Sequence, residues 1–139
     1  MRTVRMNAFR LLAAALLTCA VTTPASAQTR TPLDAYKAYL EAASKATSAD
    51  ALFPHISKEY KASLQNAPKA EVDKMLKMSI AKEKLQDIAV TSQQVGASKA
   101  VMELKAKTGD GRPTTGKVTM VKEAGAWKLD EDAWATPTR

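Results

Sequence analysis

The hydrophobic positions follow a helical period in the first half of the chain and an alternating period in the second. Apolar residues first recur at three- and four-residue spacing, as on one face of a helix, at Leu33, Tyr36, Leu40 and Ala43. Thr31 is a suitable N-cap, Pro32 fits the first helical position, and Asp34 complements the helix dipole. The pattern predicts a helix that begins after Thr31 and fades near Thr47.

Shorter helical pieces are expected next. Ser48 begins a short turn that Pro54 ends, and Ser57 is placed to cap the segment KEYKASLQN before Pro68. A clearer helical period then covers 69–85, with charged residues opposite an apolar stripe. The stripe consists of Val72, Met75, Leu76, Ser79 and Ile80. We therefore expect two more helices before the chain changes character at Asp87.

Strand signals dominate the rest of the chain. Residues 88–95 are rich in Val, Thr and Ile, 100–106 alternate apolar and polar positions, and 116–123 and 127–129 are further strands. A loop at 109–113 and a turn around Gly125 separate them. Helices followed by antiparallel strands predict an α+β fold, with the helices packed on one face of a curved sheet.

The last two strands contain both tryptophans. Val118 and Met120 share one face, and Trp127 shares a face with Leu129 on the next strand. If these faces coincide, Trp127 packs across from Met120 and belongs to the core. Trp134 lies outside the clear alternation, so two alternatives stay open: it caps the sheet edge, or it is exposed.

The first 27 residues have the three parts of a secretory signal peptide. The segment carries three arginines and no acid, then the short apolar run LLAAALLTCA, and ends on Ala25-Ser26-Ala27. The run is shorter than the ~20 residues that span a bilayer. We predict cleavage after Ala27, no membrane span after cleavage, and a periplasmic or secreted protein. A retained N-terminal anchor is the alternative.

The remaining residues, 28–139, are expected to form a single α+β domain. The only cysteine, Cys19, lies in the predicted leader, where Thr18 replaces the Gly or Ala that usually precedes a lipidated cysteine. We therefore expect neither a lipoprotein nor a disulfide. Removing the leader lowers the formal net charge from +7 to +4. The remaining positive and negative charges are interleaved, and no basic run contains aromatic residues between its charges. Both observations argue against nucleic-acid binding.

Candidate chemistry is sparse. His55 is the only histidine and lies in a turn, so we expect a structural or solvent-exposed residue there, and neither a metal site nor a cofactor. Methionines can coordinate copper(I), and four of them lie in predicted elements: Met75, Met78, Met102 and Met120. Because they lack a tight M-x-M pattern or a histidine partner, we expect them to fill the core.

Three stretches resemble the nuclear transport factor 2-like superfamily, which includes cystatin-like and ketosteroid-isomerase-like proteins. They are TPLDAYKAYLEAASKA, LFPHISKEY and VTMVKEAGAWKLDEDAW. The resemblance implies that helices and a bent sheet form a cone, whose interior can hold a small apolar molecule. The residues expected to line it are Tyr36, Leu40, Phe53, Leu76, Ile80, Met102, Leu104, Met120 and Trp127.

Non-catalytic binding is the function that these observations favour. One candidate ligand is a small apolar molecule in the cone. The other is a protein partner on the exposed sheet face, and this partner can be a second copy bound near Val101 and Val121. The alternative is an isomerase- or dehydratase-like enzyme, because ketosteroid-isomerase relatives use a tyrosine with carboxylic acids. Tyr36, Tyr39, Tyr60 and Asp87 are the candidates for these roles, and no acid aligns with a catalytic position.

Overall fold

The computed structural model describes residues 30–82 and 84–138, so the predicted leader lies outside the described residues. Its helical elements come first: α1 (Pro32–Lys45), the 3-10 helix η1 (Ala49–His55), α2 (Lys58–Asn66) and α3 (Lys69–Lys82). The strands follow: β1 (Gln86–Val95), β2 (Lys99–Lys107), β3 (Pro113–Glu123) and β4 (Ala126–Ala135). The predicted α+β class is confirmed. Within the described ranges, no helix is long and apolar enough to cross a bilayer.

Both predicted helix caps form. The Thr31 hydroxyl accepts the backbone N–H of Asp34 at 3.1 Å, and the Ser57 hydroxyl accepts the backbone N–H of Tyr60 at 3.0 Å. Each bond satisfies an N–H group that has no carbonyl partner inside its own helix. The two caps therefore set the starts of α1 and α2.

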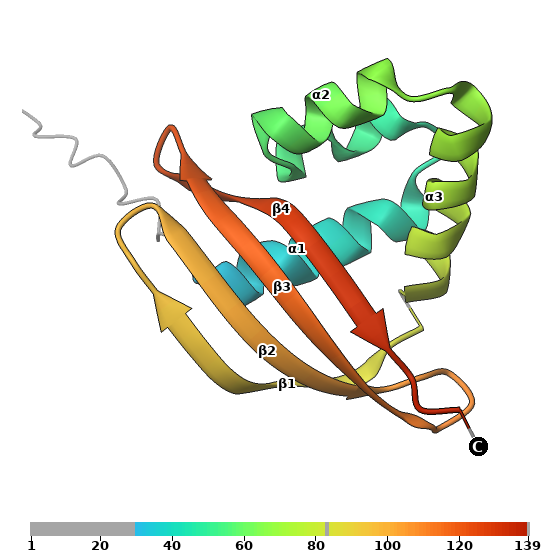
Figure 1. The fold of residues 1–139 in the computed structure, drawn as a ribbon, viewed down its shortest axis with the longest axis vertical. Helices are drawn as coiled ribbons and strands as arrows, with labels where there is room; N and C mark the ends of the chain where they lie inside the picture. Colours follow the sequence, from blue (N-terminus) through green and yellow to red (C-terminus); the bar gives the residue numbers. More distant parts are fainter. Residues whose placement is uncertain (1–29, 83, 139) are drawn as a thin grey trace, which may run out of the picture.

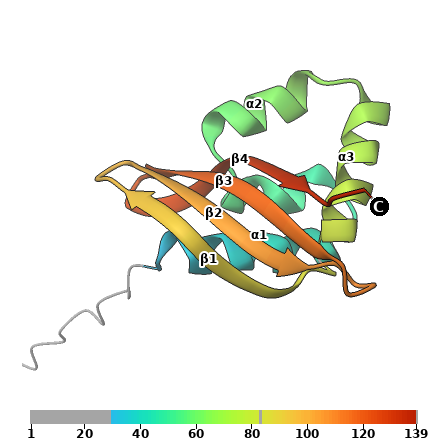
Figure 2. The ribbon, with the colours of Figure 1, turned by 60° about the horizontal axis from the view of Figure 1, so that its bottom comes forward.

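The strands form one antiparallel sheet in the order β1-β2-β3-β4 (Figure 1). Helix α1 crosses one face of the sheet, and η1, α2 and α3 continue past the β4 edge (Figures 1 and 2). Figure 1 looks onto the opposite face, which no described helix covers. The sheet therefore has a helix-facing side and an uncovered side.

The core lies between the helices and the sheet. On β2, Ala100, Met102, Leu104 and Ala106 are buried and alternate with exposed or half-buried residues, as predicted. Leu76 of α3 is buried as well, and Val72 and Met75 pack against the core from the same helix. The side chains of Ser79 and Ile80, which were predicted to extend this stripe, lie outside the described residues.

The turn between β3 and β4 changes the predicted pairing of Trp127. Ala124 and Gly125 both have positive φ, 48° and 78°, as in the two-residue turns that match the twist of a hairpin. This turn places Trp127 opposite Lys122, and Leu129 opposite Met120. The predicted pairing of Trp127 with Met120 is therefore wrong. With this two-residue turn, Leu129, two residues after Trp127, takes that place.

Strand β4 extends six residues beyond the predicted end at Leu129, and a bulge interrupts the alternation just after that residue. Thr119 pairs with Glu131 and Met120 pairs with Leu129, which leaves Asp130 without an opposite residue. The inward residues are odd-numbered before the bulge and even-numbered after it. As a result Trp134 lies within β4 and packs against the core.

Candidate functional site

The predicted cavity residues lie between the helices and the sheet, and most are fully packed. Tyr36, Met102 and Met120 have no surface accessible to water. Leu40, Leu76 and Leu104 are also buried, whereas Phe53 and Trp127 are half-buried. The side chain of Ile80 lies outside the described residues. Because a side chain without accessible surface touches no water-sized space, protein atoms fill the region around Tyr36, Met102 and Met120.

A polar cluster joins α1 to β4 inside this packed region. The Tyr36 hydroxyl donates a hydrogen bond to a carboxylate oxygen of Asp132 at 3.1 Å. The indole N–H of Trp134 donates to the same hydroxyl at 2.9 Å. Asp132 and Trp134 both follow the bulge at Asp130, so the change of alternation brings them to the helix-facing side. The cluster satisfies polar groups that would otherwise be buried without partners.

Burial first, and then the Asp132 carboxylate, raise the pKa of Tyr36 far above its ordinary value. The hydroxyl therefore stays protonated throughout the physiological range, and it serves as a donor to Asp132. Its donor hydrogen and one lone pair are both engaged, and the side chain has no accessible surface. This arrangement holds α1 against β4, and it leaves no approach for a substrate to the hydroxyl.

Two more tyrosines extend the aromatic part of the site. The rings of Tyr36 and Tyr39 stack with centroids 6.1 Å apart. The Tyr60 hydroxyl lies 3.4 Å from the Met75 sulfur and donates to it. Burial, followed by the neighbouring Tyr39, raises the pKa of Tyr60. These contacts connect α2 and α3 to the same packed region.

Asp87, the acid that the enzyme alternative would pair with a tyrosine, lies elsewhere. It is exposed at the start of β1 with a positive φ of 55°, and its carboxylate pairs with Lys107 at 3.1 Å. Asp tolerates this left-handed backbone conformation better than most residues do, which is typical of a turn. The acid that contacts Tyr36 is instead Asp132.

The sequence did not predict the contact of Asp132 with Tyr36, and it left open whether Trp134 is buried. Both have the same reason. Strict alternation through β4 places both residues on the wrong side, and the bulge that corrects it depends on pairing with β3. The available signal was the spacing of Asp132 and Trp134 by two residues, which is the period of a strand. Recognising that signal required the assumption that β4 continues past Asp130.

His55 lies at the end of η1, beside a shallow hollow of about 310 Å³. The hollow is also lined by Arg30, Ala38, Glu41, Ala42 and Lys45. Partial burial, followed by the charges of Lys128 and Arg30, lowers the pKa of His55. The imidazole is therefore largely neutral at neutral pH.

The methionines fit the predicted role in part. Met102 and Met120 are fully buried and Met75 is partly buried against the core. Met78 is 55% exposed, so its prediction as a core residue is wrong. Among the described residues, no three His, Cys, Asp or Glu side chains come together in a group suited to a metal ion.

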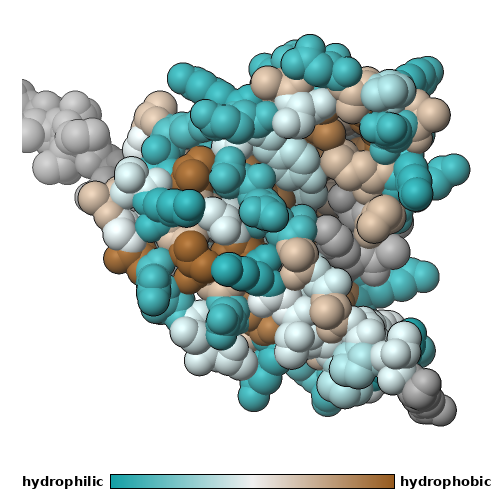
Figure 3. Space-filling model, viewed as in Figure 1, coloured by the Kyte–Doolittle hydropathy of each residue, from teal (hydrophilic) through white to brown (hydrophobic). Residues whose placement is uncertain are grey.

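The uncovered face of the sheet is a mixed surface. Val101 and Val121 are half-buried there, and Lys99, Lys105, Lys117, Glu103 and Glu131 project around them. A hollow of about 400 Å³ crosses this face and is lined by residues of all four strands, including Thr91, Glu103, Lys117 and Ala133. Figure 3 shows apolar surface in brown between hydrophilic side chains on this side of the molecule.

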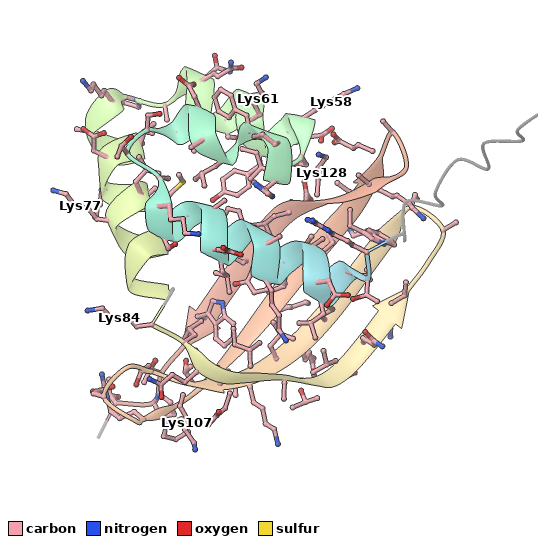
Figure 4. The ribbon with its side chains drawn as sticks, turned by 180° about the vertical axis from the view of Figure 1, so that it is seen from behind. Lys58, Lys61, Lys77, Lys84, Lys107 and Lys128 are labelled. Carbon is pink, nitrogen blue, oxygen red and sulfur yellow. The ribbon has the colours of Figure 1, made fainter. Side chains whose placement is uncertain are left out.

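The six lysines labelled in Figure 4 lie apart from one another. Lys58, Lys61 and Lys128 are near α2 and η1, and Lys77, Lys84 and Lys107 follow the left side of that view from α3 down to the end of the sheet. Several have local partners: Lys61 lies 4.7 Å from the centre of the Phe53 ring, and Lys128 donates to the Pro54 carbonyl. These contacts serve the packing of η1 against α2 and β4.

Comparisons with known proteins leave the family open. No family model, no curated protein and no solved structure matches the chain.

Proposed function

We propose that this protein is an exported, non-catalytic interaction module that binds a protein partner on the uncovered face of its sheet. The supporting observation is the contrast between the two sides of the sheet. The helix-facing side is filled around Tyr36, Met102 and Met120, whereas the other side is open and carries Val101 and Val121. A filled interior disfavours a small apolar ligand and favours recognition at the surface.

The chemistry of this face favours a partner with an acidic rim. Three lysines and two glutamates surround the valines, so the local charge is positive, as is the charge of the whole chain. An apolar centre with a charged rim is the usual arrangement of protein interfaces. Acidic side chains on the partner would pair with Lys99, Lys105 and Lys117, and apolar side chains would cover the valines.

We also propose that the chain belongs to the nuclear transport factor 2-like superfamily and acts in the periplasm or outside the cell. Support for the family comes from the order of helices followed by an antiparallel sheet with α1 on one face, together with the resemblance of the three stretches. Support for export comes from the basic, apolar and A-x-A segments of 1–27. Mass spectrometry of the exported protein should find Gln28 at the N-terminus; an intact Met1 or a lipidated Cys19 would contradict export with cleavage after Ala27.

The enzyme alternative has one supporting observation, the contact between Tyr36 and Asp132. Its geometry instead favours a structural role. A tyrosine that polarises a substrate carbonyl must present its hydroxyl to the substrate, and the Tyr36 hydroxyl already donates to Asp132 without accessible surface. We therefore assign this pair to the stability of the helix–sheet contact.

Site-specific photo-crosslinking in the exporting cell tests the proposed face. A photoreactive residue at Val121 should give a covalent adduct with one protein partner, because this side chain lies on the proposed surface. The matched control carries the same residue at Ala62, which is exposed on α2 away from the sheet. Equal adducts from both positions, or an adduct from Ala62 alone, would contradict the proposal.

A further inference from the structure

The β4 edge of the sheet is partly covered, whereas the β1 edge is open. At the β4 edge, Ile56 forms a bridge with Leu129, and the backbone N–H of Ser57 donates to the Leu129 carbonyl at 2.8 Å. These contacts cover the middle of that edge. Among the described strands β1 pairs with β2 alone, so its other side is an open edge.

The open edge lacks the charges that usually protect such strands. From Ile88 to Val95, β1 has no charged residue and no proline, although Lys, Glu and Pro are the common means of preventing edge-to-edge pairing. Val95, at the end of the strand, is 52% exposed. A hollow of about 460 Å³ lies beside it, lined by Gln94, Val95, Gly96, Lys99 and Val101. A second backbone can therefore approach the stretch from Ile88 to Val95 without burying a charged residue of that stretch.

The position of a bulge in β1 divides its residues between the two faces of the sheet. Val90 pairs with Leu104 and Ser92 pairs with Glu103, so Thr91 is the extra residue. The helix-facing residues are Ile88, Val90, Gln93 and Val95. The residues on the uncovered side are Ala89, Thr91, Ser92 and Gln94. The sequence of helix-facing and uncovered positions from Ile88 to Val95 is therefore symmetric about the point between Thr91 and Ser92.

We propose that a second copy of this chain pairs with β1 along this edge, antiparallel about a two-fold axis between Thr91 and Ser92. In this register Ile88 lies opposite Val95 of the other copy, Val90 opposite Gln93, and Ala89 opposite Gln94. Each residue therefore meets a residue from the same face of the sheet, as antiparallel pairing requires. Shifting the register by one residue opposes residues of different faces at nearly every pair, and shifting it by two does so at the pair next to the axis.

Charge also favours this arrangement. Asp87, which precedes the uncharged stretch and pairs with Lys107 of its own copy, would lie near the turn that carries Lys99 of the other copy. The contact occurs twice by symmetry, and it joins opposite charges. The two sheets would then form one continuous sheet whose uncovered faces lie on the same side. The inference stands whether or not that face binds the partner proposed above.

Mass in solution is the first test. By light scattering the wild-type chain should have the mass of two copies, and a variant with both Gln93→Lys and Val95→Lys should have the mass of one. Both positions are exposed, so circular dichroism should show an unchanged fold. The matched control is Val121→Lys on the sheet face, which should leave the mass at two copies. A single-copy mass for the wild type at all concentrations overturns the proposal.

The same measurement separates edge pairing from face pairing. A wild-type dimer that survives the two edge substitutions overturns the proposal, and its loss on Val121→Lys would show that the second copy binds the sheet face. A higher assembly also overturns it, because the two-fold pairing leaves no second free β1 edge. The crosslinking test of the sheet face does not depend on the mass of the protein in solution. The proposal of edge pairing and the proposal of a partner on the sheet face can therefore fail separately.

Disulfide trapping tests the register. In a full chain carrying Cys19→Ser, the pair Ala89→Cys and Gln94→Cys should crosslink two copies, because each cysteine lies opposite the other in the partner copy. The two positions of one strand are roughly 16 Å apart, too far for an internal disulfide. The control has Gln94→Cys alone and should stay uncrosslinked. Crosslinking of that control with equal yield would overturn the register.

Discussion

At the scale of single residues, Gly116 leaves room for the indole ring of Trp134. A Cβ atom at position 116 would lie 2.5–2.8 Å from three ring carbons of Trp134, which is closer than atoms can approach. The ring covers the glycine from the neighbouring strand and so replaces the side chain that the strand lacks. The glycine is therefore needed for the indole to reach Tyr36.

Gly116→Ala should destabilise the protein by about 1–3 kcal/mol, because the ring must move and its hydrogen bond to Tyr36 must lengthen. Urea unfolding followed by circular dichroism measures the change. In a Trp134→Ala background the same substitution should cost almost nothing, since no ring occupies the space. An equal cost in both backgrounds would show that the close approach is not the cause.

Tyr36→Phe should cost about 1–3 kcal/mol of unfolding free energy, because it leaves the Trp134 N–H and an Asp132 oxygen without this partner. Asp132→Asn is the matched comparison, since its amide oxygen still accepts from the tyrosine, and it should cost less. Thermal unfolding with tryptophan fluorescence reports both. If Tyr36→Phe is as stable as the wild type, the cluster contributes nothing to the attachment of α1 to β4.

At the scale of elements, the two helix caps differ in their surroundings. Ser57 is fully buried, and its hydroxyl also donates to Asp130 at 2.7 Å, so this cap links α2 to the bulge of β4. Thr31 is exposed and bonds only near its own helix start. Ser57→Ala should therefore cost about 1–2 kcal/mol and Thr31→Ala about 0.5–1 kcal/mol in urea unfolding. The reverse order would contradict the role of Asp130.

Sequence patterns predict elements well where the signal is local. The caps at Thr31 and Ser57 and the alternation of β2 depend on neighbours in the chain, and all three are confirmed. The bulge at Asp130 depends on pairing between strands, and no local pattern marks it. The place of Trp134 was left open and Asp132 was missed for that reason, whereas the pairing of Trp127 depends on the length of the turn at Ala124 and Gly125.

At the scale of the whole molecule, the order of helices and strands sufficed to predict the α+β class. The sequence did not predict how completely the interior is filled, because packing depends on the relative placement of α1 and the sheet. The polarity of the uncovered face was partly predictable: Val101 and Val121 were expected on the side opposite the core, and they lie there.

Stability of the whole protein should decrease through His55 as the pH falls below about 6.5, the ordinary pKa of histidine. Its pKa is lowered in the folded protein below the ordinary value of 6.5, so the unfolded chain binds a proton more readily in this range. The contribution of His55 is therefore fully present above pH 7 and is lost as the pH falls. His55→Gln should flatten this part of a profile of melting temperature against pH; an unchanged slope would contradict the assignment.

The most direct test of the central claim is native mass spectrometry of the protein isolated without denaturation from the exporting cell. We expect the chain to carry a protein partner, and no small molecule. The partner should be lost from a Val121→Glu variant, because the added carboxylate repels an acidic surface and disrupts the apolar centre. A small molecule bound in equal amount to the wild type and to Val121→Glu would contradict a filled interior and a binding sheet face.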